Sequence, residues 1–158
     1  MTTVAWDGVS MAADTLSTDG WGLKEFCEGK IWVGRDFLVG SSGEWGQAYK
    51  WWKSLPKGAY GYEVVEHGIK DWNRETNDPV LMLVHFEDNN PKDPVIYRIA
   101  SGVFYKTSLQ MFAIGSGRDY ALASMYWGKS SAEAVKCAMA FDNATGGEII
   151  EREFYHCE

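Results

Sequence analysis

The sequence predicts an α+β domain in which helix pairs cover antiparallel sheets. Two hairpin patterns open the chain, and two pairs of helical stretches follow, separated by further strands. Hairpins build antiparallel sheets, and helices that occur in separate pairs pack as layers outside such sheets. The 158 residues suffice for one domain with a sizeable core and are too few for two, so a single domain over residues 1–158 is expected.

The first elements are two predicted hairpins. In residues 2–14, apolar residues flank Asp7-Gly8, a dipeptide that favours the positive φ angles of a type I′ turn. A second strand pair is predicted at residues 30–33 and 37–40. Residues 16–29 are polar and contain glycines, so they are expected to form a loop between the pairs.

A helix is predicted next, over residues 44–55, because apolar residues recur at the spacing of one helical face. These residues are Trp45, Ala48, Tyr49 and Trp52. Such a stripe more often belongs to a core than to a pocket or an interface. Pro56 ends this helix, and a shorter helix is expected over residues 62–72.

The second half of the chain alternates strands and helices. Strands are predicted over residues 80–86, 95–99, 104–105 and 111–114, and helices over 119–127 and 131–141. Ser130 and Glu133 have the spacing of a capping box at the start of the last helix. A final strand is predicted over residues 148–155.

Composition narrows the classes of function. The net charge of −7 argues against a nucleic-acid groove or an anionic membrane surface as partner, because both require a positive field. The cysteines lack CxxC or metal-ligand spacing and are expected to be reduced thiols, and the scattered histidines predict no metal cluster. No secretion signal or apolar run of membrane length is evident, which favours the cytoplasm.

The opening residues MTT raise the question whether Thr2 is an ordinary strand residue or a reactive terminus, since a Thr after the first Met is common. A terminal threonine hydroxyl acts as a nucleophile when its own α-amine takes the proton. The site also needs a cation near the amine, a carboxylate that holds the cation, and a backbone N–H for the oxyanion. Asp14, Lys30 and Gly43 are candidates for these roles. Taken alone, a surface Asp, a solvated Lys and a helix-start Gly are the more frequent interpretations.

Five segments resemble, in order and approximate spacing, those of proteasome β subunits and the bacterial peptidase HslV. They are TTVAWDGVSMAADT, GKIWVG, LVGSSGEWGQA, FAIGSGRDYALASM and AFDNATGGEI. The resemblance runs from Thr2 to about Ile150 and is weakest over residues 57–107. It implies the four-layer αββα sandwich of the N-terminal nucleophile (Ntn) hydrolases, with two antiparallel sheets flanked by helix pairs.

The resemblance also implies a set of catalytic residues. Thr2 matches the nucleophile, which becomes the chain terminus once Met1 is removed. Asp14 and Lys30 match its carboxylate–lysine pair, and Gly43 matches the glycine of the oxyanion hole. The residues that match the group around the terminal amine are Ser116, Asp142 and Thr145, the last of which stands where relatives often have Ser.

A substrate site is implied beside the nucleophile. Thr18 matches the residue that pairs with the substrate as an added strand, and Leu16 stands where relatives usually carry a polar or basic residue. The residues aligned by eye around the pocket for the residue before the cleaved bond are Ser17, Glu28, Ser41 and Trp45. There Ser41 would leave space, Trp45 would form an apolar wall, and Glu28 would favour a basic group.

The resemblance extends to cofactors, partners and location. No organic cofactor is implied, although a structural Na⁺ or Mg²⁺ would bind backbone carbonyls near Asp142 and Thr145. The implied partners are a peptide or unfolded-protein substrate, further copies of the chain in a homo-oligomeric ring, and an AAA+ ATPase unfoldase, with no nucleic acid and no membrane. The expected location is the cytoplasm of a bacterial or bacteriophage-infected cell.

Three functions remain open from the sequence. The first is a threonine-type endopeptidase that works through a Thr2 acyl-enzyme after Met1 removal. The second is a non-peptidase Ntn amidase with the same nucleophile, and the third is a catalytically silent structural or interaction protein with the same fold. A phosphate loop at Gly115-Ser116-Gly117 is disfavoured, because GxGxxG and GxxxxGK[ST] spacings are absent. The glycosylation sequon at residues 143–145 lacks a secretion signal.

Overall fold

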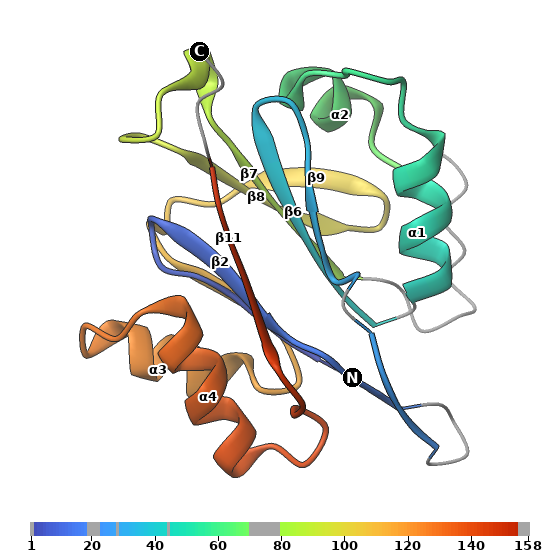
Figure 1. Ribbon diagram of the computed structural model, residues 1–158. Helices are drawn as coiled ribbons and strands as arrows, with labels where there is room; N and C mark the ends of the chain where they lie inside the picture. Colours follow the sequence, from blue (N-terminus) through green and yellow to red (C-terminus); the bar gives the residue numbers. More distant parts are fainter. Residues whose placement is uncertain (1, 19–22, 28, 44, 70–79, 155–158) are drawn as a thin grey trace.

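The computed structural model describes residues 2–18, 23–27, 29–43, 45–69 and 80–154 (Figure 1). Within these residues the chain forms three antiparallel sheets and four α-helices, so the predicted α+β class is confirmed. None of the helices in this part of the chain is both long and apolar enough to cross a membrane.

Two larger sheets form the centre of the molecule. The four-stranded sheet has the order β10 (Phe112–Gly115), β1 (Thr3–Trp6), β2 (Ser10–Asp14) and β11 (Ile149–Glu153). The five-stranded sheet has the order β5 (Ile31–Val33), β6 (Phe37–Ser42), β7 (Val80–His85), β8 (Val95–Ala100) and β9 (Val103–Lys106). A two-stranded ribbon of β3 (Leu16–Thr18) and β4 (Lys24–Phe26) extends beside them.

Helices lie against both larger sheets. Helix α3 (Arg118–Tyr126) contacts β1 and β10, and α4 (Ser131–Phe141) contacts β1, β2 and β11. Helices α1 (Trp45–Ser54) and α2 (Gly61–His67) lie on the side of the five-stranded sheet (Figure 1). The short 3₁₀ helix η1 (Glu87–Asn89) follows β7. The predicted capping box is confirmed: Ser130 Oγ accepts from the Glu133 N–H at 3.2 Å, and Glu133 accepts from the Ser130 N–H at 2.9 Å.

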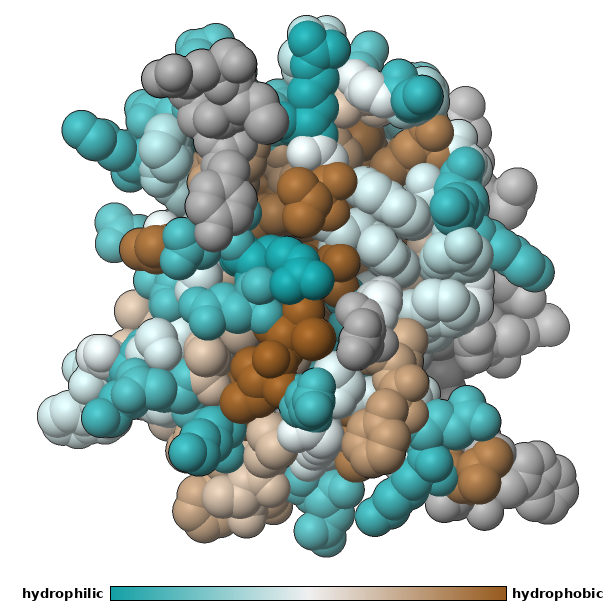
Figure 2. Space-filling view, in the orientation of Figure 1, coloured by the Kyte–Doolittle hydropathy of each residue, from teal (hydrophilic) through white to brown (hydrophobic). Residues whose placement is uncertain are grey.

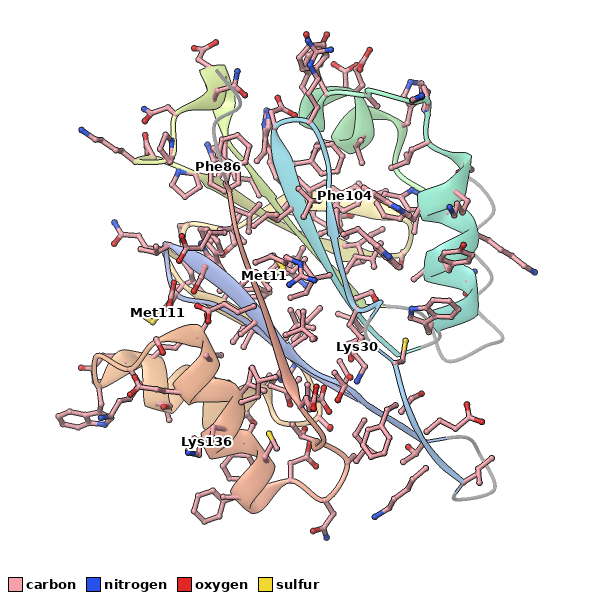
Figure 3. The ribbon with its side chains drawn as sticks, viewed as in Figure 1. Met11, Lys30, Phe86, Phe104, Met111 and Lys136 are labelled. Atoms are coloured by element: carbon pink, nitrogen blue, oxygen red, sulfur yellow. The ribbon has the colours of Figure 1, made fainter. Side chains whose placement is uncertain are left out.

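Three hydrophobic clusters hold these elements together. Met11 and Val4 meet Met82 between the two sheets, and Figure 3 labels Met11 there in the middle of the molecule. Figure 2 shows that further apolar residues reach the surface in the middle of this face. Ala5 and Ala12 point the other way, toward α3 and α4. The third cluster packs the far face of the five-stranded sheet against α1 and α2. Since both faces of β1 and β2 are buried, their sequences are almost continuously apolar.

Three local expectations were wrong. Gly8 has a positive φ but Asp7 does not, so the first turn is not type I′; the Asp7 carboxylate instead accepts the N–H groups of Val9 and Ser10, each at 2.8 Å. Residues 16–29 are not simply a loop, because they contain the β3–β4 ribbon. In α1 the predicted stripe packs against the core at Ala48, Tyr49 and Trp52, but Trp45 is 38% exposed and Trp51, outside the stripe, is buried.

A buried pair of Asp36 and His85 lies at the five-stranded sheet, outside the predicted site. Asp36 accepts from the Gly61 N–H at 2.7 Å, and its other carboxylate oxygen lies 3.0 Å from His85 Nε2. The pair links the start of β6 and the end of β7 to the start of α2. Because each group has its partner within the fold, we assign the pair a structural role.

Candidate active site

Thr2, Asp14 and Lys30 meet where the ends of the two larger sheets adjoin. Thr2 precedes β1, Asp14 ends β2 and Lys30 precedes β5. The Thr2 hydroxyl donates to Asp14 Oδ1 at 2.8 Å, and the Lys30 ammonium donates to the Thr2 hydroxyl oxygen. Lys30 appears near the start of the chain in Figure 3. The Thr2 hydroxyl therefore contacts both a carboxylate and an ammonium group.

Asp14 holds this cluster together. Its side chain has no exposed surface, and its Oδ1 accepts from Lys30 Nζ at 3.0 Å as well as from Thr2. Backbone N–H groups supply two more donors, from Thr3 to Oδ1 at 3.0 Å and from Gly146 to Oδ2 at 2.9 Å. A buried carboxylate is tolerated only with such partners. Asp14 therefore fixes Lys30, the start of β1 and the turn before β11 relative to one another.

Lys30 is a buried cation with a perturbed titration. Burial lowers its pKa below the ordinary 10.5, and the charge and hydrogen bond of Asp14 offset this only in part. Its third acceptor is the backbone carbonyl of Leu16, at 2.5 Å. A backbone carbonyl accepts a hydrogen bond whatever side chain its residue carries. An apolar Leu16 therefore serves this role as well as a polar residue would.

A second polar cluster lies beside the first. Ser116 Oγ and Thr145 Oγ1 each donate to Asp142 Oδ2 at 2.5 Å, and the Ala144 N–H donates to Oδ1 at 3.2 Å. Thr145 Oγ1 also lies 2.7 Å from Thr3 Oγ1. The Ser116 N–H donates to the Thr2 carbonyl at 3.0 Å. The two clusters therefore meet at residues 2 and 3 of the chain.

Asp142 should contribute to the free energy of unfolding, and this contribution should be lost at acid pH. Burial raises its pKa, but the bonds from Ser116, Thr145 and Ala144 outweigh burial, so its pKa lies below the ordinary 3.8. The unfolded chain therefore takes up this proton first as the pH falls, and the stabilisation is present above about pH 4 and lost below it. We expect Asp142→Asn to reduce the loss of unfolding free energy between pH 6 and pH 3, measured by denaturant titration. Asp119→Asn, at a side chain that is 85% exposed, is the control; an equal change there would contradict the prediction.

Gly115 permits the close approach that holds Thr2. Its φ is +100°, and a Cβ at this position would lie 1.6 Å from the Thr2 carbonyl oxygen. We expect Gly115→Ala to lower the free energy of unfolding by at least about 2 kcal/mol more than Gly128→Ala. Gly128 is a matched control, because its φ is +85° but no atom lies within 4 Å of the added Cβ. Equal losses in denaturant unfolding would show that the Thr2 contact is unimportant.

A pocket opens beside the Thr2 hydroxyl. Thr2 and Lys30 line it, together with five further residues predicted from the sequence, namely Ser17, Thr18, Ser41, Gly43 and Trp45. Gly43 has a φ of +85°, which favours glycine, and lies between the end of β6 and the start of α1. Glu28, the remaining predicted pocket residue, lies outside the described residues.

Sequence reasoning missed several residues of the site. Cys27 and Ser42 also line the pocket, and Thr3 joins the Asp142 cluster. Leu16, noted from the sequence only as a departure from the relatives, lines the pocket as well. Alternation along β1 could have indicated Thr3, since successive side chains of a strand point to opposite faces. Cys27 has a free, half-buried thiol, and its backbone N–H donates to the Thr15 carbonyl at 2.7 Å. It follows the β3–β4 ribbon, which the expectation of a loop concealed.

Comparisons with known proteins support the fold. No family model and no curated protein matches the chain. Among solved structures, it is similar to Thiobacillus denitrificans BPH, at 20% identity over 96% of this chain and 95% of that one, with a TM-score of 0.66. The same protein in complex with epoxomicin matches at 19% identity over 96% of each chain, with a TM-score of 0.63. The Gly-1 mutant of Anbu from Hyphomicrobium sp. strain MC1 matches at 12% identity over 98% and 82%, with a TM-score of 0.68. The likeness shows the fold.

These findings correct the family assignment made from the sequence. Membership of the proteasome β-subunit and HslV family was wrong, because no family model matches and the similar structures are BPH and Anbu at 12–20% identity. The short motifs were weak evidence for a family, because part of their sequence is required by backbone geometry alone. Gly43 and Gly115, for example, both have positive φ angles, which favour glycine.

Proposed function

We propose that the chain is a threonine-type endopeptidase in which Thr2 becomes the N-terminal nucleophile once Met1 is removed. The observation that carries this proposal is the Thr2 hydroxyl in contact with the Lys30–Asp14 pair, on the wall of a pocket. Removal of Met1 converts the Thr2 nitrogen from an amide, which is not a base, into an amine. Reference amine pKa values of about 7.7–8.0 leave part of such a group neutral near pH 7.

In the first step the Thr2 α-amine takes the hydroxyl proton while Oγ attacks the carbonyl carbon of a peptide bond. The positive charge on Lys30 disfavours protonation of the amine at rest and stabilises negative charge on Oγ. The Gly43 N–H is the proposed donor to the oxyanion, because Gly43 lines the same pocket as Thr2.

The second step releases the products. The C–N bond breaks, the ammonium group of Thr2 protonates the leaving amine, and the acyl group remains as an ester on Oγ. A water molecule then gives a proton to the Thr2 amine and attacks the ester carbonyl carbon. The ester C–O bond breaks, the ammonium group returns the proton to Thr2 Oγ, and the acid is freed. Through both steps the Ser116 N–H, 3.0 Å from the Thr2 carbonyl oxygen, keeps the backbone of the nucleophile in place.

The direct test combines intact mass with covalent labelling. We expect the native chain to be lighter by one Met residue and epoxomicin, a peptide epoxyketone that Thiobacillus BPH binds, to form an adduct that maps to Thr2. The control is a chain that carries an uncleavable N-terminal extension, which blocks the amine and should prevent the adduct. A native chain that has lost Met1 and still forms no adduct would overturn the proposal.

We further propose that the two sheets and their helix pairs form the four-layer αββα sandwich of the Ntn hydrolases, as one domain over residues 1–158. The hydrophobic clusters support this arrangement, since one lies between the sheets and one lies between each sheet and its helices. The order helix, sheet, sheet, helix requires three such apolar interfaces.

The proposed partners are peptides or unfolded proteins as substrates, further copies of the chain in a homo-oligomeric ring, and an AAA+ ATPase unfoldase, without nucleic acid or membrane. A peptidase in the cytoplasm of a bacterial or bacteriophage-infected cell has to be kept from folded proteins, and a ring would confine its sites. No organic cofactor is proposed. A structural Na⁺ or Mg²⁺ near Asp142 and Thr145 would use backbone carbonyls, because the Asp142 carboxylate already accepts from Ser116, Thr145 and Ala144.

A further inference from the structure

We infer that the pocket beside Thr2 selects a flat, neutral side chain of the substrate, and that Trp45 determines this specificity. The inference rests on the proposed function, because it names the substrate class of that same site. It concerns binding, so it can be tested separately from the chemical step.

The Trp45 ring is held in place before any ligand arrives. Its indole N–H donates to the Gly29 carbonyl at 2.9 Å, and its ring stacks on Tyr49 with centroids 4.7 Å apart and planes at 13°. Lys53 Nζ lies 5.4 Å from the centre of the Tyr49 ring, so a cation–π contact adds to the stack of Trp45 and Tyr49 along α1. A wall that is already ordered costs little conformational entropy on binding, which favours a partner with a complementary flat surface.

Apart from Lys30, the rest of the described lining is neutral. Leu16 is apolar and buried, and the other lining groups apart from Lys30 are hydroxyls, the Cys27 thiol and the Gly43 backbone. Lys30 is the one charged residue among the described lining residues, and Asp14 pairs with it.

None of the described lining residues is a carboxylate. A cationic substrate side chain would therefore lose hydration without meeting a counter-charge among them, and it would approach the Lys30 ammonium. An aromatic or flat apolar side chain loses little hydration and gains contact with the Trp45 ring. We expect discrimination of about tenfold, at the low end of what fully apolar pockets achieve, because Trp45 and Leu16 are the apolar part of the described lining. Glu28 was expected to favour a basic group, so a lysine peptide belongs in the test.

The experiment measures binding of peptides that the protein cannot cleave. Acetyl-Ala-Ala-X-amides with X = Phe, Lys or Ala are titrated into the Met1-free Thr2→Ala chain, and dissociation constants are determined by calorimetry. We expect the Phe peptide to bind about tenfold more tightly than the Lys peptide. Adding Trp45→Ala should abolish this difference, and Trp45→Phe, which keeps an aromatic wall without the bond to Gly29, should retain most of it.

Tyr126→Ala is the matched control, because this exposed aromatic residue lies at the end of α3, among residues that do not line the pocket. The inference would be overturned by equal affinities for the Phe and Lys peptides, by tighter binding of the Lys peptide or by no binding of any peptide. It would also be overturned by a difference in affinity that remains in the Trp45→Ala variant. Turnover by the unmodified chain is measured in parallel. A chain that shows the binding preference but no turnover would count against the peptidase proposal and not against the role of Trp45.

Discussion

Thr2→Ala should abolish peptide hydrolysis, with kcat/KM at least about 1,000-fold below that of the unmodified chain. The substitution removes the only atom that could form the proposed acyl-enzyme, Oγ, while the Lys30–Asp14 pair stays in place. Water attack without a nucleophile would lack the covalent route altogether. The measurement is release of a fluorescent amine from short peptide amides, repeated with unfolded casein to separate peptidase from small-amide activity.

Two comparisons distinguish loss of the nucleophile from loss of folding. Thr2 is 3% exposed, and its hydroxyl bonds to Asp14 and to Lys30, which keep each other as partners when the hydroxyl is removed. Thr2→Ala should therefore cost only about 2 kcal/mol of unfolding free energy. Thr2→Ser keeps a hydroxyl at the same position and should retain turnover. Full activity of a stably folded Thr2→Ala chain would rule out Thr2 as the nucleophile.

Asp14→Ala should lower the free energy of unfolding by about 3–5 kcal/mol, because it leaves a buried ammonium group without its counter-charge. The substitution also removes the acceptor of two backbone N–H groups, those of Thr3 and Gly146. Denaturant titration of the purified chain measures the loss. Activity should fall as well, since Lys30 would no longer be held against the Thr2 hydroxyl.

The second substitution Lys30→Met identifies the cause. In the double variant Asp14→Ala/Lys30→Met neither charge of this pair remains, so part of the lost stability should return even though the backbone N–H groups stay unsatisfied. Asp119→Ala, at a side chain that is 85% exposed, should change stability by less than about 0.5 kcal/mol. If the double variant is less stable than Asp14→Ala alone, the pair is not the source of the effect.

Local patterns in the sequence predicted most of the elements. Hydrophobic spacing located α1 and β10, and the capping box at Ser130 and Glu133 placed the start of α4. The β3–β4 ribbon escaped detection because it has little core of its own: residues 24–26 are exposed, and its strands have three residues each. A short polar strand gives no periodic signal, since such a signal arises from alternating burial.

The exposure of Trp45 was also outside the reach of the local pattern. Spacing alone put it on the buried face of α1, but its ring lies at the pocket, where the Gly29 carbonyl and the Tyr49 ring hold it. The carbonyl comes from the segment just before β5, so this contact depends on how β5 lies against α1. Helical periodicity records only which residues share a face and not what that face meets.

By itself, the sequence determined which elements form, because turn residues, caps and apolar spacing act over a few neighbouring positions. It also supplied Thr2, Asp14 and Lys30 as chemical candidates, each of which had an ordinary alternative. Only the tertiary structure decided that these side chains touch, because their contacts join residues 2, 14 and 30 across the ends of two packed sheets. Burial in that packed environment, which no local pattern encodes, is also what lowers the pKa of Lys30.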